Sequence, residues 1–325
     1  MPVTSITTDP EALTMTVIAD FAASAERVWD AYADPRQIER FWGPPEYPAQ
    51  FTRHDFAVGG RSAYSMTGPE GDRHDGYWEW IAVTPQTSFE ILDGFANADG
   101  SPNDDMPAMR MTVTFDATGT GTRTRTTMIS YFTSLEALEQ IVEMGAVEGA
   151  RYAMGQMDVV LADLHTFAAD IPTFAQILSD TQVRVSRVID GSGEQVWRAH
   201  NDADLMKQWM LGPDGWTMPV CQVATEVGDS YRYEWAPDGS GEGGFGFEGE
   251  LLESAPPHRA VTTENMIGMP GGGTTNELTL TPIADATLLT LVITYPSKEL
   301  RDTILATGMT DGMEVSYQRL ETVVN

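Results

Sequence analysis

The sequence of 325 residues contains a single cysteine, Cys221, which excludes an internal disulfide framework and zinc or iron–sulfur sites built from several cysteines. The five histidines show neither an H-x-H nor an H-E-x-x-H spacing, and the chain has no G-K-[ST] and no G-x-S-x-G motif. We therefore expect no metal site and no cofactor.

Positive charge is also scarce, with only two lysines and 19 basic residues against 48 acidic ones. The net charge of -29 repels phosphate backbones and anionic membrane surfaces, so we expect no nucleic-acid partner and no membrane partner. No apolar run reaches the ~18 residues that a membrane span needs, and residues 1–10 lack the pattern of a signal peptide. We expect a soluble, cytoplasmic protein.

The chain repeats itself at long range. Val28-Trp29 recurs as Val196-Trp197, and the aligned pairs continue to the end of the chain. These pairs are Phe41 with Trp209, Tyr64 with Tyr233, Pro85 with Pro256, Tyr131 with Tyr295, and Gly149 with Gly312. The repeat predicts two homologous domains, at residues 1–165 and 182–325, joined by a linker at 166–181. We expect the two repeats to pack against each other.

Both repeats show the same order of patterns. An alternating strand precedes a helix opened by Ser24 or Ser192, and several strands with turn residues between them follow. Each repeat closes with an amphipathic helix, at 134–164 and 297–324, that contains glycines typical of a bend or a close approach. This order predicts an α+β helix-grip fold, in which a curved antiparallel sheet surrounds a long C-terminal helix.

These residues resemble a known family. Trp29, Trp42-Gly43-Pro44 and Gly59-Gly60 in the first repeat have counterparts in Trp197, Gly212-Pro213 and Gly228 in the second. The pattern is similar to the START/Bet v 1-like (SRPBCC) superfamily and, within it, to the C-terminal domain of the activator of Hsp90 ATPase. The resemblance implies the helix-grip fold, and it leaves the function open because unrelated functions share this fold.

The two repeats differ at one position of the strand that follows the first hairpin turn. The first repeat has Trp78 where the second has Gly249. A buried indole narrows an interior, so we expect the first repeat to be filled and the second to hold the open cavity.

The strands carry many aromatic side chains, which predict either a packed core or the lining of an apolar cavity. The predicted ligand-binding residues are Tyr64, Met66, Trp78, Trp80, Tyr131, Trp209, Tyr231, Tyr233, Trp235, Phe247, Tyr295 and Met313. We expect the ligand to be a small apolar or aromatic molecule that is carried, sequestered or sensed.

Two alternatives stay open. One is a cyclase, dehydratase or hydrolase whose cavity uses general acid–base groups, with His54, Tyr64, Glu79, His200, Tyr233 and Glu248 as candidate catalytic residues. The other is a co-chaperone-like protein-binding module, which only the family resemblance suggests.

Overall fold

The computed structural model describes residues 2–97, 100–106, 108–163, 172–212, 214–239, 243–269 and 271–325. The chain divides into two compact units, residues 1–167 and 168–325. Part of the predicted linker, residues 166–171, lies outside the described ranges. Residues 174–177, also assigned to the linker, instead form a strand of the second unit.

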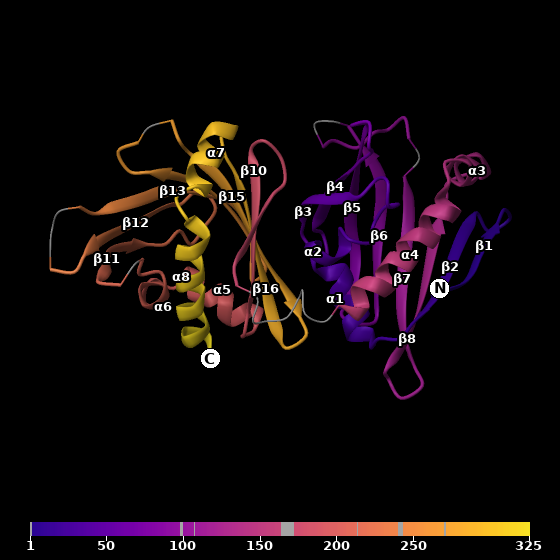
Figure 1. Ribbon diagram of the computed structural model, residues 1–325, viewed down its shortest axis with the longest axis horizontal. Coiled ribbons are helices and arrows are strands. Elements are labelled where there is room, and N and C mark those ends of the chain that lie inside the picture. Colours follow the sequence, from indigo (N-terminus) through magenta and orange to yellow (C-terminus); the bar gives the residue numbers. More distant parts are fainter. Residues whose placement is uncertain are drawn as a thin grey trace. The chain divides into compact units, whose positions relative to one another are not determined.

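In its described residues, the first unit has one eight-stranded antiparallel sheet and four helices (Figure 1). Its strand order is β1-β2-β8-β7-β6-β5-β4-β3. The elements are β1 (Val3–Asp9), β2 (Thr14–Phe21), α1 (Ala25–Ala33), α2 (Pro35–Ile38), β3 (Ala49–His54), β4 (Arg61–Thr67), β5 (Arg73–Thr84), β6 (Ser88–Ala96), β7 (Met109–Thr118), β8 (Arg123–Tyr131), α3 (Leu135–Glu143) and α4 (Ala146–Ala162).

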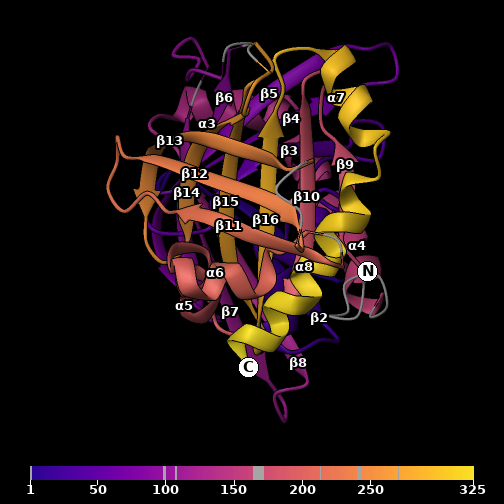
Figure 2. The same cartoon turned by 90° about the vertical axis from the view of Figure 1, so that its left-hand side faces the viewer.

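The second unit repeats this topology element by element, with the strand order β9-β10-β16-β15-β14-β13-β12-β11. In Figure 2 its helix α8 runs along the sheet, and α5 and α6 lie together at one end of the strands. The elements are β9 (Phe174–Ile177), β10 (Gln182–Ile189), α5 (Gly193–Asn201), α6 (Ala203–Trp209), β11 (Trp216–Gln222), β12 (Ser230–Pro237), β13 (Phe245–Ala255), β14 (Arg259–Met266), β15 (Thr274–Ile283), β16 (Ala286–Thr294), α7 (Lys298–Leu305) and α8 (Met309–Val324). The α+β helix-grip prediction is confirmed.

The first helix of each unit begins where its serine predicts. The Ser24 side chain accepts a hydrogen bond from the backbone N–H of Arg27, and Ser192 forms a reciprocal capping box with Gln195. These contacts satisfy backbone donors that the first helical turn leaves without partners.

The C-terminal helix of each unit is broken by a glycine. Gly145 has φ +93° and separates α3 from α4, whereas Gly308 has φ +78° and separates α7 from α8. Both values lie in the left-handed region that favours glycine. A bend is therefore present at these two residues, and each predicted single helix is in fact a pair.

The sheet face that packs against the helices is called the inner face below. In the second unit it joins Leu280 and Leu289 of the sheet to Val196 and Leu320 of the helices in one buried cluster. In the first unit, Trp29 and Tyr32 of α1 make edge-to-face contacts with Phe115 at 5.6 and 5.7 Å between ring centroids. Burial of these apolar faces is the main stabilising contribution to each unit.

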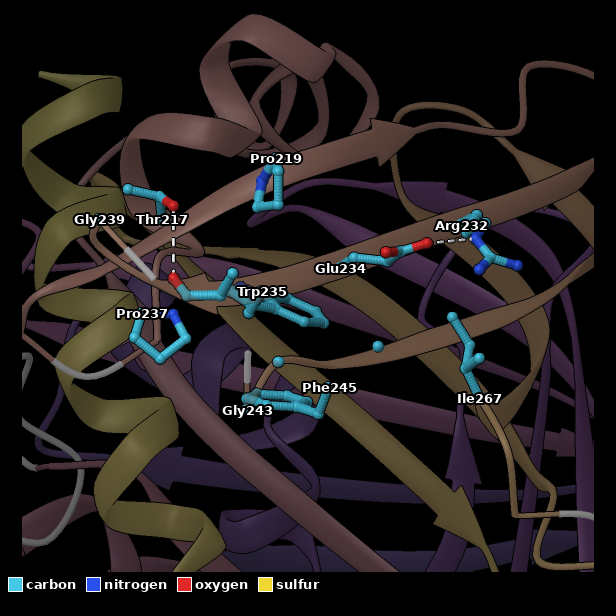
Figure 3. Close-up of a pocket in the computed structure, with 13 residues that line it drawn as sticks. Thr217, Pro219, Arg232, Glu234, Trp235, Pro237, Gly239, Gly243, Phe245 and Ile267 are labelled. Carbon is cyan, nitrogen blue, oxygen red and sulfur yellow. Dashed lines mark hydrogen bonds and ion pairs between the residues drawn. The ribbon is translucent and has the colours of Figure 1, made fainter. Parts of the chain in front are cut away.

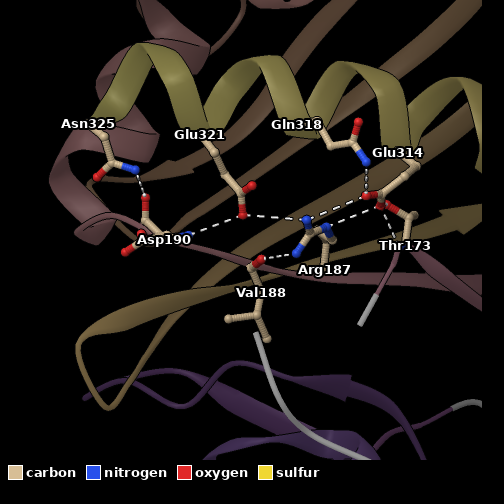
Figure 4. Close-up of polar contacts among 8 residues, drawn as sticks. All are labelled: Thr173, Arg187, Val188, Asp190, Glu314, Gln318, Glu321 and Asn325. Carbon is tan, nitrogen blue, oxygen red and sulfur yellow. Dashed lines mark hydrogen bonds and ion pairs between the residues drawn. The ribbon is translucent and has the colours of Figure 1, made fainter. Parts of the chain in front are cut away.

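A buried arginine also attaches α8 to its sheet (Figure 4). The guanidinium of Arg187 on β10 lies 3.1 Å from the Glu314 carboxylate and 3.5 Å from that of Glu321. Glu314 also accepts hydrogen bonds from the backbone N–H and the hydroxyl of Thr173 at 2.6 and 2.7 Å. The same carboxylate thus ties both β10 and the segment before β9 to α8.

The strand register corrects one pair in the repeat alignment. Val113 lies opposite Met128 in the first unit, and Leu278 lies opposite Leu291 in the second. Counting from these pairs, Tyr295 corresponds to the buried Phe132 rather than to Tyr131. Tyr131 lies on the outer face, where the Arg110 guanidinium covers its ring at 4.8 Å.

Candidate functional site

The inner face of the first repeat is closed by aromatic side chains. Trp78 and Phe51 have no exposed surface, and Trp80 and Phe89 are 2% exposed. Their rings meet edge to face, with centroids 5.6 Å apart for Trp78 and Trp80 and 5.5 Å apart for Phe51 and Trp78. These residues form a packed core, so Trp78 and Trp80, predicted to bind a ligand, fill the space that one would need.

His54 belongs to this core. Its Nε2–H donates to the Tyr32 carbonyl at 2.9 Å, and its Nδ1 lies 3.0 Å from the Ser62 hydroxyl, which also accepts from the Trp80 indole at 3.0 Å. Both ring nitrogens are thus engaged inside the protein, and His54 links β3, β4 and α1. A buried, bonded imidazole of this kind stabilises the fold and offers no free nitrogen for proton transfer.

A carboxyl group ends the closed face of the first repeat. Asp93 lies opposite Trp78 in the sheet, and its Oδ1 accepts hydrogen bonds from the Trp78 indole at 3.1 Å and from the Tyr64 hydroxyl at 3.4 Å. Burial raises the pKa of this carboxyl to about 7, and the two hydrogen bonds oppose part of the rise. The raised pKa of Tyr64, caused by burial and by the Asp93 charge, keeps that phenol protonated.

The second repeat has different residues in the corresponding row of the sheet. A row here means the residues that lie opposite one another on neighbouring strands. In the first repeat Ser62, Trp78 and Asp93 lie side by side on β4, β5 and β6. In the second repeat Tyr231 lies opposite Gly249. Since Glu248 pairs with Asn265 and Leu251 with Thr262, Gly249 lies opposite Glu264. Glu264 therefore occupies the position of Asp93.

In the pair of Tyr231 and Gly249, the large residue stands on the first strand and the small one on the second, whereas in the first repeat the small Ser62 faces the large Trp78. A Cβ on Gly249 would lie 2.8 Å from Cε1 of Tyr231, so that ring covers the glycine, and its hydroxyl donates to the Thr263 carbonyl at 2.7 Å. The space expected above Gly249 is therefore filled by Tyr231, and the expectation that the glycine itself opens a cavity is wrong at this position.

The rest of the inner face is more open in the second repeat than in the first. Register places Cys221 where the first repeat has Phe51, Ala260 in place of Phe89 and Asn276 in place of Met111. Beside these smaller or more polar groups, several side chains are only partly buried: Cys221, Tyr233, Phe247, Thr262, Glu264 and Asn276 of the inner face, and Met313 of α8. These side chains are therefore less completely buried than Trp78, Trp80, Phe51 and Phe89 of the first repeat, and they include both polar and aromatic groups.

The Glu264 carboxyl is hydrogen-bonded to one amide and influences the pKa values of three tyrosines of the second repeat. Burial raises its pKa, and a hydrogen bond from Asn276 opposes part of the rise. Burial also raises the pKa values of Tyr231, Tyr233 and Tyr295, and the Glu264 charge adds to each rise. In the described part of the chain, no arginine, lysine or histidine forms an ion pair with Glu264.

The remaining predicted residues of the second repeat support this surface. Trp209 is buried and donates from its indole to the Ala199 carbonyl at 3.0 Å, and Trp235 donates to the Met210 carbonyl at 2.6 Å. The His200 ring lies 4.7 Å from that of Trp209 between centroids, tilted by 53°, and its Nδ1 donates to the Val196 carbonyl at 2.8 Å. Burial lowers the pKa of His200, which favours the neutral imidazole.

Two predicted catalytic carboxylates face away from the interior. Glu79 pairs with Arg61 at 3.2 Å, and Glu248 pairs with Arg232 at 2.8 Å, with the glutamate side chains 45% and 49% exposed. Both alternate with inward residues, Trp78 and Phe247 respectively, and so lie on the outer face. An interior acid–base role for them has no geometric support. Met66, in the first repeat, is partly buried beside Gly43.

A hollow of about 740 Å³ lies on β11, β12 and β13, where outer-face residues line it together with Trp235 and Phe245 (Figure 3). Its charged walls are Arg232 and Glu234, which pair with each other at 2.6 Å, and the Thr217 hydroxyl donates to the Ala236 carbonyl. The polar groups that line it are thus paired within the protein. We place the candidate site on the inner face, where a carboxyl lacks such an ion pair.

Asp93 and Glu264 are the functional candidates that the sequence analysis missed. A signal was available, since Asp93 continues the period-two pattern of Phe89 and Ile91, which are both buried. Across the described residues, no three histidine, cysteine or acidic side chains lie close enough to hold a metal ion.

Comparison with known proteins shows which family the chain belongs to. The sequence profile described as "Activator of Hsp90 ATPase homolog 1-like protein" matches residues 22–162 and, a second time, residues 190–325. The chain belongs to this family. The helix-grip fold of the Hsp90-ATPase-activator-like family is a ligand-binding scaffold, and this chain carries it twice. Within the described ranges, none of the helices combines the length and apolar character needed to cross a membrane.

Solved structures similar to the chain include single-repeat proteins. Protein Ms6760 from Mycobacterium smegmatis is 46% identical over 50% of this chain and 99% of its own length, with a TM-score of 0.46. A protein from Arthrobacter aurescens is 42% identical over 50% of this chain and 94% of its own, with a TM-score of 0.47. A Rhodobacter sphaeroides protein is 27% identical over 47% of this chain and 97% of its own, with a TM-score of 0.44. No curated protein matches the chain.

Proposed function

We propose that this protein is a cytoplasmic carrier or sensor that binds one small aromatic molecule on the inner face of its second repeat. The observation that carries the proposal is the contrast between the two interiors. Trp78, Trp80 and Phe51 close the first, whereas Tyr233, Phe247 and Met313 are partly exposed on the second. An aromatic ligand matches the second surface, because ring contacts there add to the burial of apolar area.

In this proposal the first repeat does not bind the ligand. Several of its interior polar groups are hydrogen-bonded to one another, as in the chain from Trp80 through Ser62 to His54, whereas the buried Tyr32 hydroxyl has no hydrogen-bond partner among the described residues. The tightly packed inner-face rings leave no room for a ligand without displacing a buried ring, which costs several kcal/mol. The protein therefore binds one ligand per chain.

Native mass spectrometry of the freshly purified chain tests this proposal, compared with its denatured mass. We expect a bound mass at one copy per chain that is lost on denaturation. Tyr233→Ala removes one wall of the site and should lower the occupancy roughly tenfold. Tyr64→Ala, the matched change in the first repeat, should keep it. Two bound copies, or loss with Tyr64→Ala alone, would contradict the assignment.

A further inference from the structure

The first repeat has a hydrogen bond between an aromatic ring and a carboxyl whose donor is missing from the second repeat. In the first repeat an aromatic N–H, that of Trp78, donates to the Asp93 carboxyl from the neighbouring strand at 3.1 Å. The donor and the acceptor both belong to the inner face. The pair therefore shows how an aromatic ring with one N–H group fits this row of the sheet.

The second repeat keeps the acceptor and lacks the donor. Glu264 stands at the position of Asp93, and Gly249 stands at the position of Trp78. The Tyr231 ring covers Gly249, but its hydroxyl donates to the Thr263 carbonyl and not to the carboxyl. Glu264 has a hydrogen bond from Asn276 and no ion pair within the described residues. A carboxyl oxygen needs further donors when it is buried.

We propose that Glu264 is the polar anchor of the ligand, and that the ligand is a flat aromatic molecule with an N–H donor on its ring, as in an indole. This inference rests on the proposed function and adds the ligand class to it. The ligand N–H donates to Glu264 as the Trp78 indole donates to Asp93, but the ligand approaches from another side, because Tyr231 fills the place above Gly249. Its ring lies against Tyr233 and Phe247, which belong to the next row of the inner face.

The neighbouring groups fit this assignment. Asn276 holds the carboxyl from β15, and its own Oδ1 accepts from the Thr274 hydroxyl at 3.0 Å, which fixes its amide toward Glu264. Tyr295 stands at the end of the same row, and its hydroxyl is 3.8 Å from the Met309 sulfur. A carboxyl that lies in a row with aromatic residues selects a ring with one polar edge over a fully apolar one.

Isothermal titration calorimetry of the full chain with indole and with benzofuran tests the inference. Benzofuran has the shape of indole but carries a ring oxygen in place of the N–H. We expect indole to bind at one site per chain, roughly tenfold or more tightly than benzofuran, since a hydrogen bond to a charged acceptor is lost in the second case. Glu264→Leu should abolish this preference and leave the benzofuran affinity within about twofold.

Two further variants serve as controls. Glu264→Gln retains the size of the side chain and one acceptor oxygen, so it should fold normally and keep a reduced preference for indole. Glu248→Leu changes a glutamate of the outer face and should bind both probes like the unmodified protein. Equal affinity of indole and benzofuran at one site overturns the N–H inference and leaves the proposed function standing. Saturable binding of neither probe overturns both.

Discussion

The ring of Tyr231 lies directly over Gly249, so that a Cβ at residue 249 would stand 2.8 Å from Tyr231 Cε1 and would also collide with the Thr263 carbonyl. In the first repeat the corresponding pair is Ser62 and Trp78. The two repeats fill the same place in the sheet from opposite strands. One repeat uses a large residue on β5, and the other uses a large residue on β12.

Gly249→Ala should therefore destabilise the second repeat. The added methyl group must displace backbone or an aromatic ring, and overpacking of this kind costs about 1–3 kcal/mol of unfolding free energy. Gly312→Ala is the matched control, because no atom lies within 4 Å of a Cβ built there in α8. It should stabilise the helix by up to about 1 kcal/mol. Urea unfolding measures both, and an equal effect of the two substitutions would refute the packing argument.

The Asp93 carboxyl should make the stability of the first repeat depend on pH. Its pKa is about 7 in the folded protein against an ordinary value of 3.8, so the folded state holds the proton more tightly than the unfolded chain. The favourable contribution of the protonated form is complete below the ordinary value and is lost as the pH rises toward 7. Between these limits, stability falls as pH rises.

Asp93→Asn should remove this component, because the amide does not ionise. Urea unfolding of both proteins at several pH values between 4 and 8 gives the difference curve, in which the carboxylates common to both proteins cancel. We expect the variant to gain stability relative to the unmodified protein as pH rises. A difference that stays constant across the range would show that Asp93 does not titrate there.

Arg187→Met should weaken the attachment of α8 to its sheet. The substitution keeps an apolar stem of similar length and leaves the Glu314 and Glu321 carboxylates without their cation. Removing one partner of a buried ion pair costs about 3 kcal/mol. The triple variant Arg187→Met, Glu314→Gln, Glu321→Gln should recover part of this loss, since no uncompensated charge remains. Urea unfolding compares them, and a single variant as stable as the unmodified protein would contradict this role.

Much of the fold could be predicted from the sequence. The recurrence of Val28-Trp29 as Val196-Trp197 and the period-two strands were sufficient for two helix-grip domains. The breaks at Gly145 and Gly308 were indicated as bends, because glycine in a helix is costly unless the backbone needs it. Gly149 and Gly312 carry no such requirement, since a Cβ at either position meets nothing within 4 Å.

The site was harder to predict, because it depends on which residues lie opposite each other on neighbouring strands. Trp78 and Gly249 differ in size along one strand, and only the register with β12 shows that Tyr231 compensates for the glycine. Glu248 followed the correct alternation, but the sequence does not say which of the two faces the helices cover. Glu264 was overlooked because β14, with the sequence RAVTTENM, shows no clear alternation of apolar and polar residues.

The most direct test of the account is an NMR titration of the full chain, carrying ¹³C-labelled methionine methyl groups, with indole. Met313 packs against the inner face of the second repeat, whereas Met111 and Met154 are buried in the first. We predict saturable shifts of the Met313 methyl signal and unchanged Met111 and Met154 signals. Saturable shifts at Met111 or Met154, with Met313 unchanged, would contradict the claim that the second repeat is the binding repeat.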